Sequence, residues 1–212
     1  MKKFALVIYV FLSAITVSAD NIEEVFVNMP DSIIPYLNMS IRTDMVDKYK
    51  SKTHIETKNL LDGESLIIRM ADNYIDMQLN KATNLSIAQL EKNDSTKILC
   101  LVKTYGNPAI ESSVGFYTSD WKVIADNSFG LPDFSDSKVM TDMLTCCPDT
   151  MSAERFKDIQ KTIEPAMVAA TLFEDNTINV FINSPLLTKE ENKALDTIKK
   201  QKSFKWNGDI FK

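Results

Sequence analysis

The sequence predicts an α+β fold in which an antiparallel β-meander sheet packs with several short helices. Apolar residues first recur at helical spacing, up to Tyr49, and then alternate with polar residues at the strand period of two between Leu66 and Thr118. Connections of only a few residues join the alternating segments, which favours antiparallel hairpins over β-α-β units. The 5 glycines are spread singly along 212 residues, which excludes the clustered glycines of a Walker A or GxGxxG loop.

Two helices are expected before the sheet. The first spans 20–29, where one apolar stripe is followed by a proline, a residue that stops a helix. The second spans 40–49, and between them Asp31 and Ser32 are placed to cap a short turn through 33–37. The stripes contain Ile22, Val25, Phe26 and Met29 in the first helix, and Ile41, Met45, Val46 and Tyr49 in the second.

The meander is expected to contain five strands, with a short sixth strand after them. Asp72-Asn73 supplies the first tight turn, because Asp and Asn tolerate positive φ there, and Gly106-Asn107-Pro108 supplies a later turn. The expected strands cover 66–70, 74–79, 85–90, 98–105 and 110–118, and the short sixth strand covers 122–125.

Helices and strands alternate in the last third of the chain. A hairpin turns around Asp175-Asn176, and a capping box from Thr188 to Glu191 begins the last helix. Ser152 is placed to cap the helix before that hairpin. Helices are expected over 139–144, 152–163 and 188–200, and strands over 167–173, 177–182 and 203–206.

The chain is expected to form one α+β domain over 20–212. Residues 126–137, rich in Asp and Ser, are its most linker-like stretch and mark a candidate sub-boundary. Six residues around each Asp-Asn turn are alike, at 71–76 and 174–179, so two weakly related α+β halves stay open as an alternative.

The amino terminus has the three-part layout of a secretory signal peptide over 1–19. Lys2 and Lys3 form a positive region, an apolar run follows, and small residues stand at Val17-Ser18-Ala19. The apolar run is shorter than the ~20 residues of a membrane-spanning helix. We therefore expect cleavage after Ala19, no transmembrane segment in the rest of the chain, and a periplasmic or secreted protein.

Composition also limits the partners and the chemistry. The net charge of −5 argues against a nucleic-acid partner, because phosphate binding relies on Lys and Arg. His54 is the single histidine and is expected on the surface or at the start of a strand, so a site with several histidine ligands is excluded for a monomer. Asp133, Asp136 and Asp142 lack the spacing of an EF-hand loop and its glycine. No metal and no cofactor are therefore expected.

The three cysteines are expected to be structural. Cys100 lies in an apolar strand, where a packed thiol is the plain interpretation. A disulfide from Cys100 to Cys146 or Cys147 is the alternative, because an exported chain meets an oxidising compartment. Neither a CxxC motif nor a nearby histidine is present, so no catalytic or metal role is expected.

Several segments of the chain carry a family resemblance. The most specific is the aromatic segment at 112–121, and shorter ones lie at 32–37, at 63–65 and at 206–208 with Phe211. Together they resemble the DUF3256 family, a family of unknown function found in Bacteroidales. The resemblance implies an exported bacterial protein, and it transfers no catalytic residue because the family has no established activity.

The resemblance also implies sites of O-glycosylation. Exported proteins of that bacterial group carry glycans at Asp-Ser or Asp-Thr followed by an apolar residue or Thr. Ser32, Thr150 and Thr197 stand in such a sequence. For Ser32 a plain helix cap is the alternative interpretation.

Three aromatic residues are candidate ligand contacts. Phe116, Tyr117 and Trp121 are close enough in sequence to form an aromatic platform for a sugar or a peptide. Neighbouring residues of a strand face opposite sides, so at least one of Phe116 and Tyr117 is expected in the core. Packing of all three in the core or in a turn is the alternative.

The sequence as a whole favours a non-enzymatic envelope protein that binds an unknown protein or glycan partner through its sheet. No recognised catalytic spacing is present. A hydrolase built on two carboxylates is one alternative, and an envelope assembly or structural factor is another. A deep pocket with convergent, strongly perturbed carboxylates would favour the hydrolase.

Overall fold

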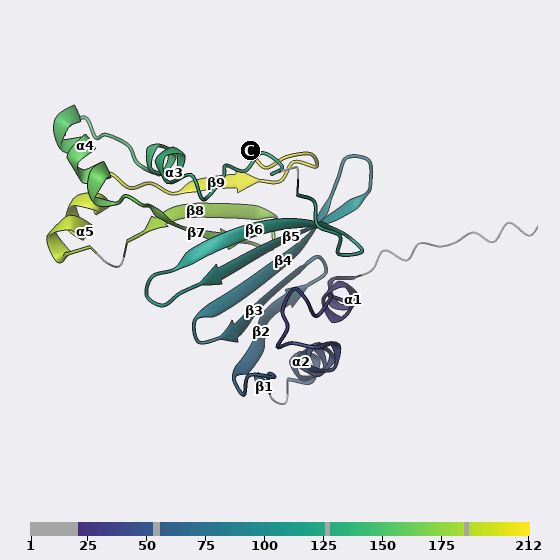
Figure 1. Ribbon diagram of the computed structural model, residues 1–212. Helices are drawn as coiled ribbons and strands as arrows, with labels where there is room; N and C mark the ends of the chain where they lie inside the picture. The colour runs from purple at the N-terminus through teal and green to yellow at the C-terminus, as the bar shows by residue number, and fades with distance from the viewer. Residues whose placement is uncertain (1–20, 53–55, 126–127, 185–186) are drawn as a thin grey trace, which may run out of the picture.

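The computed structural model describes residues 21–52, 56–125, 128–184 and 187–212. They form two antiparallel sheets and five short helices (Figure 1), which confirms the α+β class. The larger sheet is a six-stranded meander in the order β1-β2-β3-β4-β5-β6, and the smaller sheet has the order β7-β8-β9. The strands are β1 (Glu56–Lys58), β2 (Glu64–Ala71), β3 (Tyr74–Asn80), β4 (Thr83–Glu91), β5 (Lys97–Tyr105), β6 (Glu111–Thr118), β7 (Met167–Leu172), β8 (Thr177–Asn183) and β9 (Lys202–Lys205).

Two helices, α1 (Ile22–Val27) and α2 (Met39–Ser51), lie against one face of the six-stranded sheet (Figure 1). Their apolar stripes pack on side chains from β2, β3, β4 and β5, and Trp121 belongs to the same cluster. Each helix begins after an asparagine, Asn21 or Asn38, whose side chain accepts a backbone N–H of the first turn. The two expected helices are therefore confirmed.

A buried guanidinium group stabilises the packing of α1 and α2. Arg42 in α2 is 1% exposed, and its Nε donates to the carbonyl of Val27 at 3.1 Å. Its two Nη groups donate to the carbonyls of Leu37 and Met29, and Nη1 also pairs with the Asp31 carboxylate at 2.9 Å. Because the planar fork of arginine serves several acceptors at once, Arg42 joins α2 to the chain that leaves α1.

The three-stranded sheet packs on the opposite face of the six-stranded sheet, over β4, β5 and β6, and the two sheets share one apolar core. Buried hydrogen bonds also connect them. The hydroxyl of Tyr74 donates to the carbonyl of Leu172 at 2.9 Å, and the N–H of Ala170 donates to Ser112 Oγ at 2.9 Å. Burial raises the pKa of Tyr74 to about 12, so its hydroxyl stays protonated and available as a donor.

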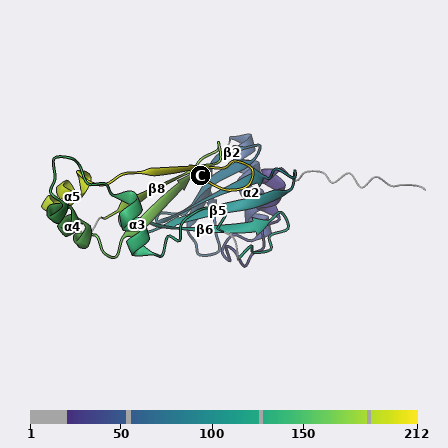
Figure 2. The same cartoon turned by 90° about the horizontal axis from the view of Figure 1, so that it is seen from above.

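The other three helices lie beside the small sheet. They are α3 (Ser137–Leu144), α4 (Ala153–Thr162) and α5 (Lys189–Asp196), and Figures 1 and 2 both place α4 and α5 together at the end far from α1 and α2. Ser152 caps α4 through its hydroxyl, and Thr188 begins α5 with a complete capping box. Both predicted caps are confirmed.

Two strands differ from the expectation. β1 was not expected, because three residues with one buried side chain leave no alternating pattern. The short strand expected over 122–125 is a single bridge, from Val123 to Tyr117. Trp121 turns the chain here with a φ of 65° and places its ring in the core, so little of this segment lies alongside β6.

The turns also differ in detail. Residues 31–37 form successive turns, and the cap of the following helix is Asn38. Asn176 adopts the expected positive φ, at 62°, whereas the tight turn at Asp72-Asn73 is made without positive φ. The two hairpin turns meet, because Asn73 Nδ2 donates to Asn176 Oδ1 at 3.4 Å.

The described part of the linker-like stretch 126–137 packs closely. Phe129 and Leu131 are buried in the core that the two sheets share. Asp136 caps α3, since its side chain accepts the N–H of Val139 at 3.0 Å. This stretch therefore lies beside the sheets and forms one wall of the site described below.

Candidate functional site

β6 is an edge strand of the six-stranded sheet. On one side it pairs with β5 from Glu111 to Thr118. On the other side, the described residues pair with it only near its end, where Val123 bridges Tyr117 and hydrogen bonds of 2.8 and 2.9 Å flank the bridge. The edge therefore already accepts a short antiparallel segment of the same chain.

The rest of this edge presents unpaired backbone groups. The carbonyl of Phe116 points outward and accepts the N–H of Ile124, and in an antiparallel strand every second residue points its N–H and C=O to the same side. Ser112 and Val114 therefore present their N–H and C=O outward. Within the part of the chain that the structure describes, these four groups have no backbone partner. Ser112 is 5% exposed and Val114 is half-buried, so another extended chain can reach these unpaired groups only by entering directly beside β6.

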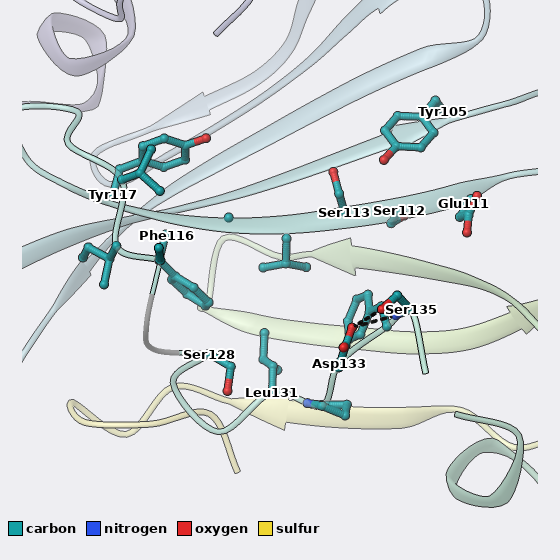
Figure 3. A pocket seen from close by; sticks show the side chains of 17 residues that line it. Tyr105, Glu111, Ser112, Ser113, Phe116, Tyr117, Ser128, Leu131, Asp133 and Ser135 are labelled. Carbon is teal, nitrogen blue, oxygen red and sulfur yellow. Dashed lines mark hydrogen bonds between the residues drawn. The ribbon is translucent and has the colours of Figure 1, made fainter. Parts of the chain in front are cut away.

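A hollow of about 660 Å³ follows this edge (Figure 3). β6 forms one wall, and part of the stretch 128–135 forms the other. Figure 3 shows Phe116 and Leu131 pointing toward one another from the two walls, with Tyr117 on the other side of the strand. Half-buried Val114 and Phe134 add apolar surface to this hollow. We call it the β6 groove.

A second hollow, of about 410 Å³, lies on the helix-covered side of the same strand. It shares Ser113, Tyr117 and Val123 with the β6 groove. Trp121 and the β5 residue Lys103 also line it. We call it the Lys103 hollow. The open edge of β6 thus has a hollow on either side.

The charges of the two hollows differ. Exposed carboxylates of Glu111 and Asp133 line the β6 groove. Ser135 donates its O–H and its N–H to Asp133 at 2.7 and 2.9 Å, and these hydrogen bonds hold the pKa of Asp133 below its ordinary value. Lys103 is half-buried and forms no ion pair with another described residue. One hollow is therefore acidic and the other basic.

The three predicted aromatic contacts lie at one end of these hollows. Phe116 is buried, with its ring centroid 4.7 Å from that of Phe129. Trp121 is 7% exposed, and its Nε1 donates to the carbonyl of Val25 at 3.0 Å. Tyr117 is half-buried, with its ring centroid 5.5 Å from that of Trp121. Phe116 and Tyr117 face opposite sides of the sheet as predicted, and a ligand contact through any of the three stays a prediction.

Sequence reasoning missed most of the groove. Val114, Leu131 and Phe134 line it, and none of them was expected to. One signal was present, because the short strand expected over 122–125 can cover only part of the edge of the long strand expected over 110–118. Nothing in the sequence indicated that residues 128–135 return to that edge.

The cysteines occupy two different environments. Cys100 is buried in β5, and burial raises the pKa of its thiol. Cys146 and Cys147 are exposed in the segment after α3, and all three are free thiols. The expected packed thiol at Cys100 thus matches its position in the core.

Of the remaining predicted residues, Ser32 lines the Lys103 hollow, and Thr150 and Thr197 line neither hollow. Ser32, Thr150 and Thr197 are exposed, as glycosylation requires, and His54 lies outside the described residues. The described residues contain no group of three or more His, Cys, Asp or Glu placed to hold a metal ion. Among the same residues, no helix is long and apolar enough to cross a membrane.

A further hollow, of about 510 Å³, lies between the β2–β3 and β7–β8 hairpins. Arg69 and Glu174 face one another there as an ion pair, and exposed Phe173 stands beside them. The two charges satisfy each other, so this hollow presents no unpaired charge of that ion pair to a ligand.

The fold and the groove define an α+β protein in which the partly unpaired edge of β6 lies beside an apolar and acidic hollow. Residues 14–211 match the model of the family described as "Protein of unknown function (DUF3256)", and the chain belongs to that family. A solved domain of an uncharacterized protein from Porphyromonas gingivalis W83 is similar over 90% of this chain and 96% of that domain, with a TM-score of 0.70 and 20% identity. That likeness shows a shared fold. No curated protein matches the chain.

Proposed function

We propose that this protein is a non-enzymatic binding module whose partner, a protein or a glycan, occupies the β6 groove. The observation that supports this function is the coincidence of an open strand edge with a hollow of about 660 Å³. Ser112 and Val114 offer hydrogen bonds there, while Val114, Leu131 and Phe134 offer apolar surface. A few polar groups beside apolar walls are typical of binding sites.

The hydrolase alternative would use the two carboxylates of the groove, Glu111 and Asp133. A glycosidase needs one carboxylic acid whose pKa is raised, so that it can donate a proton near neutral pH. Ser135 shifts the pKa of Asp133 in the opposite direction. Asp133 is therefore unsuited to the role of that acid. The unpaired edge of β6 beside these carboxylates supports the binding function instead. An assembly factor, the other alternative, would bind a protein partner and is a special case of the same proposal.

A binding experiment with two unbiased probe sets tests the function. The purified protein is exposed to a phage-displayed library of random peptides and to a glycan array. The same experiment uses Ser113→Trp, because Ser113 is exposed and lines both hollows, so a bulky ring there obstructs the site. The matched control is Ser203→Trp, since Ser203 is exposed on β9 and lines neither hollow.

We expect ligands that bind the unaltered protein and Ser203→Trp equally, and Ser113→Trp at least about tenfold more weakly. Two results would contradict the proposed function. One is that neither probe set yields a ligand. The other is that the selected ligands bind Ser113→Trp as tightly as the unaltered protein.

We also propose that the chain is exported and cleaved after Ala19, so that the mature protein begins at Asp20. N-terminal sequencing of the protein from its native cells tests this, and a chain that begins at Met1 would show the proposal to be wrong. Mass spectrometry of the same sample tests O-glycosylation, which we expect as added glycan mass on peptides with exposed Ser32, Thr150 or Thr197.

A further inference from the structure

We infer that the partner in the β6 groove is an extended polypeptide segment that joins the six-stranded sheet as a strand beside β6. The inference rests on the proposed binding function and specifies the class of partner. Ser112 and Val114 present N–H and C=O groups at the two-residue spacing with which one β-strand bonds another. A glycan has no backbone that repeats donors and acceptors at this spacing.

The chain itself shows the geometry that such a segment would adopt. Val123 lies opposite Tyr117 in an antiparallel bridge, and Ile124 donates to the carbonyl of Phe116 at 2.8 Å. A partner strand along 111–115 would lie in line with this bridge and continue the ladder. Pairing of this kind is a common mode of peptide recognition, in which the backbone provides affinity and pockets for alternate side chains provide selectivity.

The two hollows are placed to receive those alternate side chains. Successive residues of a strand point to opposite faces of the sheet. One set of side chains of the added strand would therefore enter the β6 groove against Leu131 and Phe134, and the other set would face the Lys103 hollow beside Ser113.

Charge complementarity specifies the segment further. Lys103 is half-buried without an ion-pair partner among the described residues, so an acidic side chain of the segment would satisfy it. Leu131, Phe134 and Val114 favour an apolar side chain at the neighbouring position. The expected segment thus alternates apolar residues with at least one Asp or Glu.

Backbone methylation of the ligand tests the strand pairing. The tightest peptide from the random library is synthesised as a series in which one backbone nitrogen at a time carries a methyl group. We expect methylation to weaken binding at least about tenfold at every second position next to the groove and to have little effect at the positions between. Such alternation is expected when the peptide forms backbone hydrogen bonds with β6 along one of its two edges only.

Two protein variants add independent readouts. Val114→Pro removes an outward N–H from an edge strand without removing a bond to β5, so it is expected to fold and to bind the peptide at least about tenfold more weakly. Thermal unfolding shows whether this variant folds. If it does not fold, the methylation series alone tests the strand pairing.

Lys103→Glu is expected to weaken the binding of peptides that carry the acidic residue. It is expected to strengthen the binding of peptides in which Lys replaces that residue.

The outcomes separate the inference from the proposed function. Three results would overturn the inference and leave groove binding standing. The first is that only glycans are selected, and the second is that peptides bind the groove without the alternating methylation effect. The third is that the protein associates with itself through β6 in place of binding a peptide. Peptides that bind equally well to Ser113→Trp would overturn the proposed function itself. Alternating losses in a peptide that is sensitive to Ser113→Trp support both.

Discussion

At Arg42 a permanent positive charge lies in an apolar interior. Its stabilisation depends on three backbone carbonyls and on Asp31, whose own side chain is largely exposed. Arg42→Ala would leave these buried carbonyls unpaired and open a cavity, and we expect a loss of about 3–5 kcal/mol in the free energy of unfolding. Urea unfolding followed by circular dichroism measures the loss.

Arg69→Ala is the matched control for this prediction. Arg69 also pairs with a carboxylate, that of Glu174, but both side chains are well exposed. Exposed pairs contribute at most about 1 kcal/mol, so Arg69→Ala should change the free energy of unfolding by no more than that. Equal losses for the two variants would show that burial does not distinguish Arg42.

Asp76 gives a prediction about pH. It is half-buried on β3, and burial raises its pKa although Ser86 donates a hydrogen bond to it at 2.8 Å. The folded state therefore holds the proton more tightly than the unfolded state, and the free energy of unfolding falls as the pH rises from the ordinary pKa of Asp through the raised value. Asp76→Asn removes this cost and keeps an acceptor for Ser86.

We expect Asp76→Asn to be more stable than the unaltered protein at about pH 7, and the difference to shrink as the pH falls through the raised pKa of Asp76 and the carboxylate takes up a proton. Urea unfolding across this range provides the comparison. A difference that is independent of pH, or a less stable variant at neutral pH, would contradict the burial argument.

Single residues were predictable from the sequence where a pattern repeats. The alternation in β3 placed Ile75, Met77 and Leu79 in the core, and all three are buried. Arg42 was not predictable as a core residue, because its burial depends on carbonyls that the turns after α1 bring together. Charged residues are buried only when such partners are available, and these partners are not visible in the local pattern.

At the level of elements, Ser112 connects the two sheets. Its Oγ accepts the N–H of Ala170 on β7 at 2.9 Å, in a buried position. Ser112→Ala would leave this N–H without its partner, and we expect a loss of about 1–3 kcal/mol in the free energy of unfolding. Ser113→Ala is the control, since Ser113 is exposed on the same strand, and its loss should stay within about 0.5 kcal/mol. Similar losses in the two variants would show that the hydroxyl does not hold the sheets together.

Long elements with local signals were predictable. The meander from β2 to β6 and the helices with polar caps at Ser152 and Thr188 follow from periodicity and capping chemistry. β1 was not predictable because it is stabilised by pairing with β2, with only three residues of its own. The strand expected over 122–125 is reduced to a bridge because Trp121 directs the chain by its packing in the core.

At the level of the whole molecule, the sequence predicted neither the second layer nor the groove. The small sheet covers one face of the meander and α1 with α2 covers the other, so strands far apart in the chain share a core. The β6 groove likewise needs 111–117 and 128–135 to lie together around an apolar interior. Of the residues named from the sequence, Phe116, Tyr117 and Asp133 line this groove.

Hydrogen exchange of single backbone amides, followed by NMR with and without the selected peptide, tests strand pairing at β6 most directly. If the peptide pairs with β6, the outward amides of Ser112 and Val114 exchange at least about tenfold more slowly when the peptide is bound, whereas the amide of Ser113, which already faces β5, changes little. The contrary result is a saturated complex in which Ser112 and Val114 keep the exchange rates of the free protein.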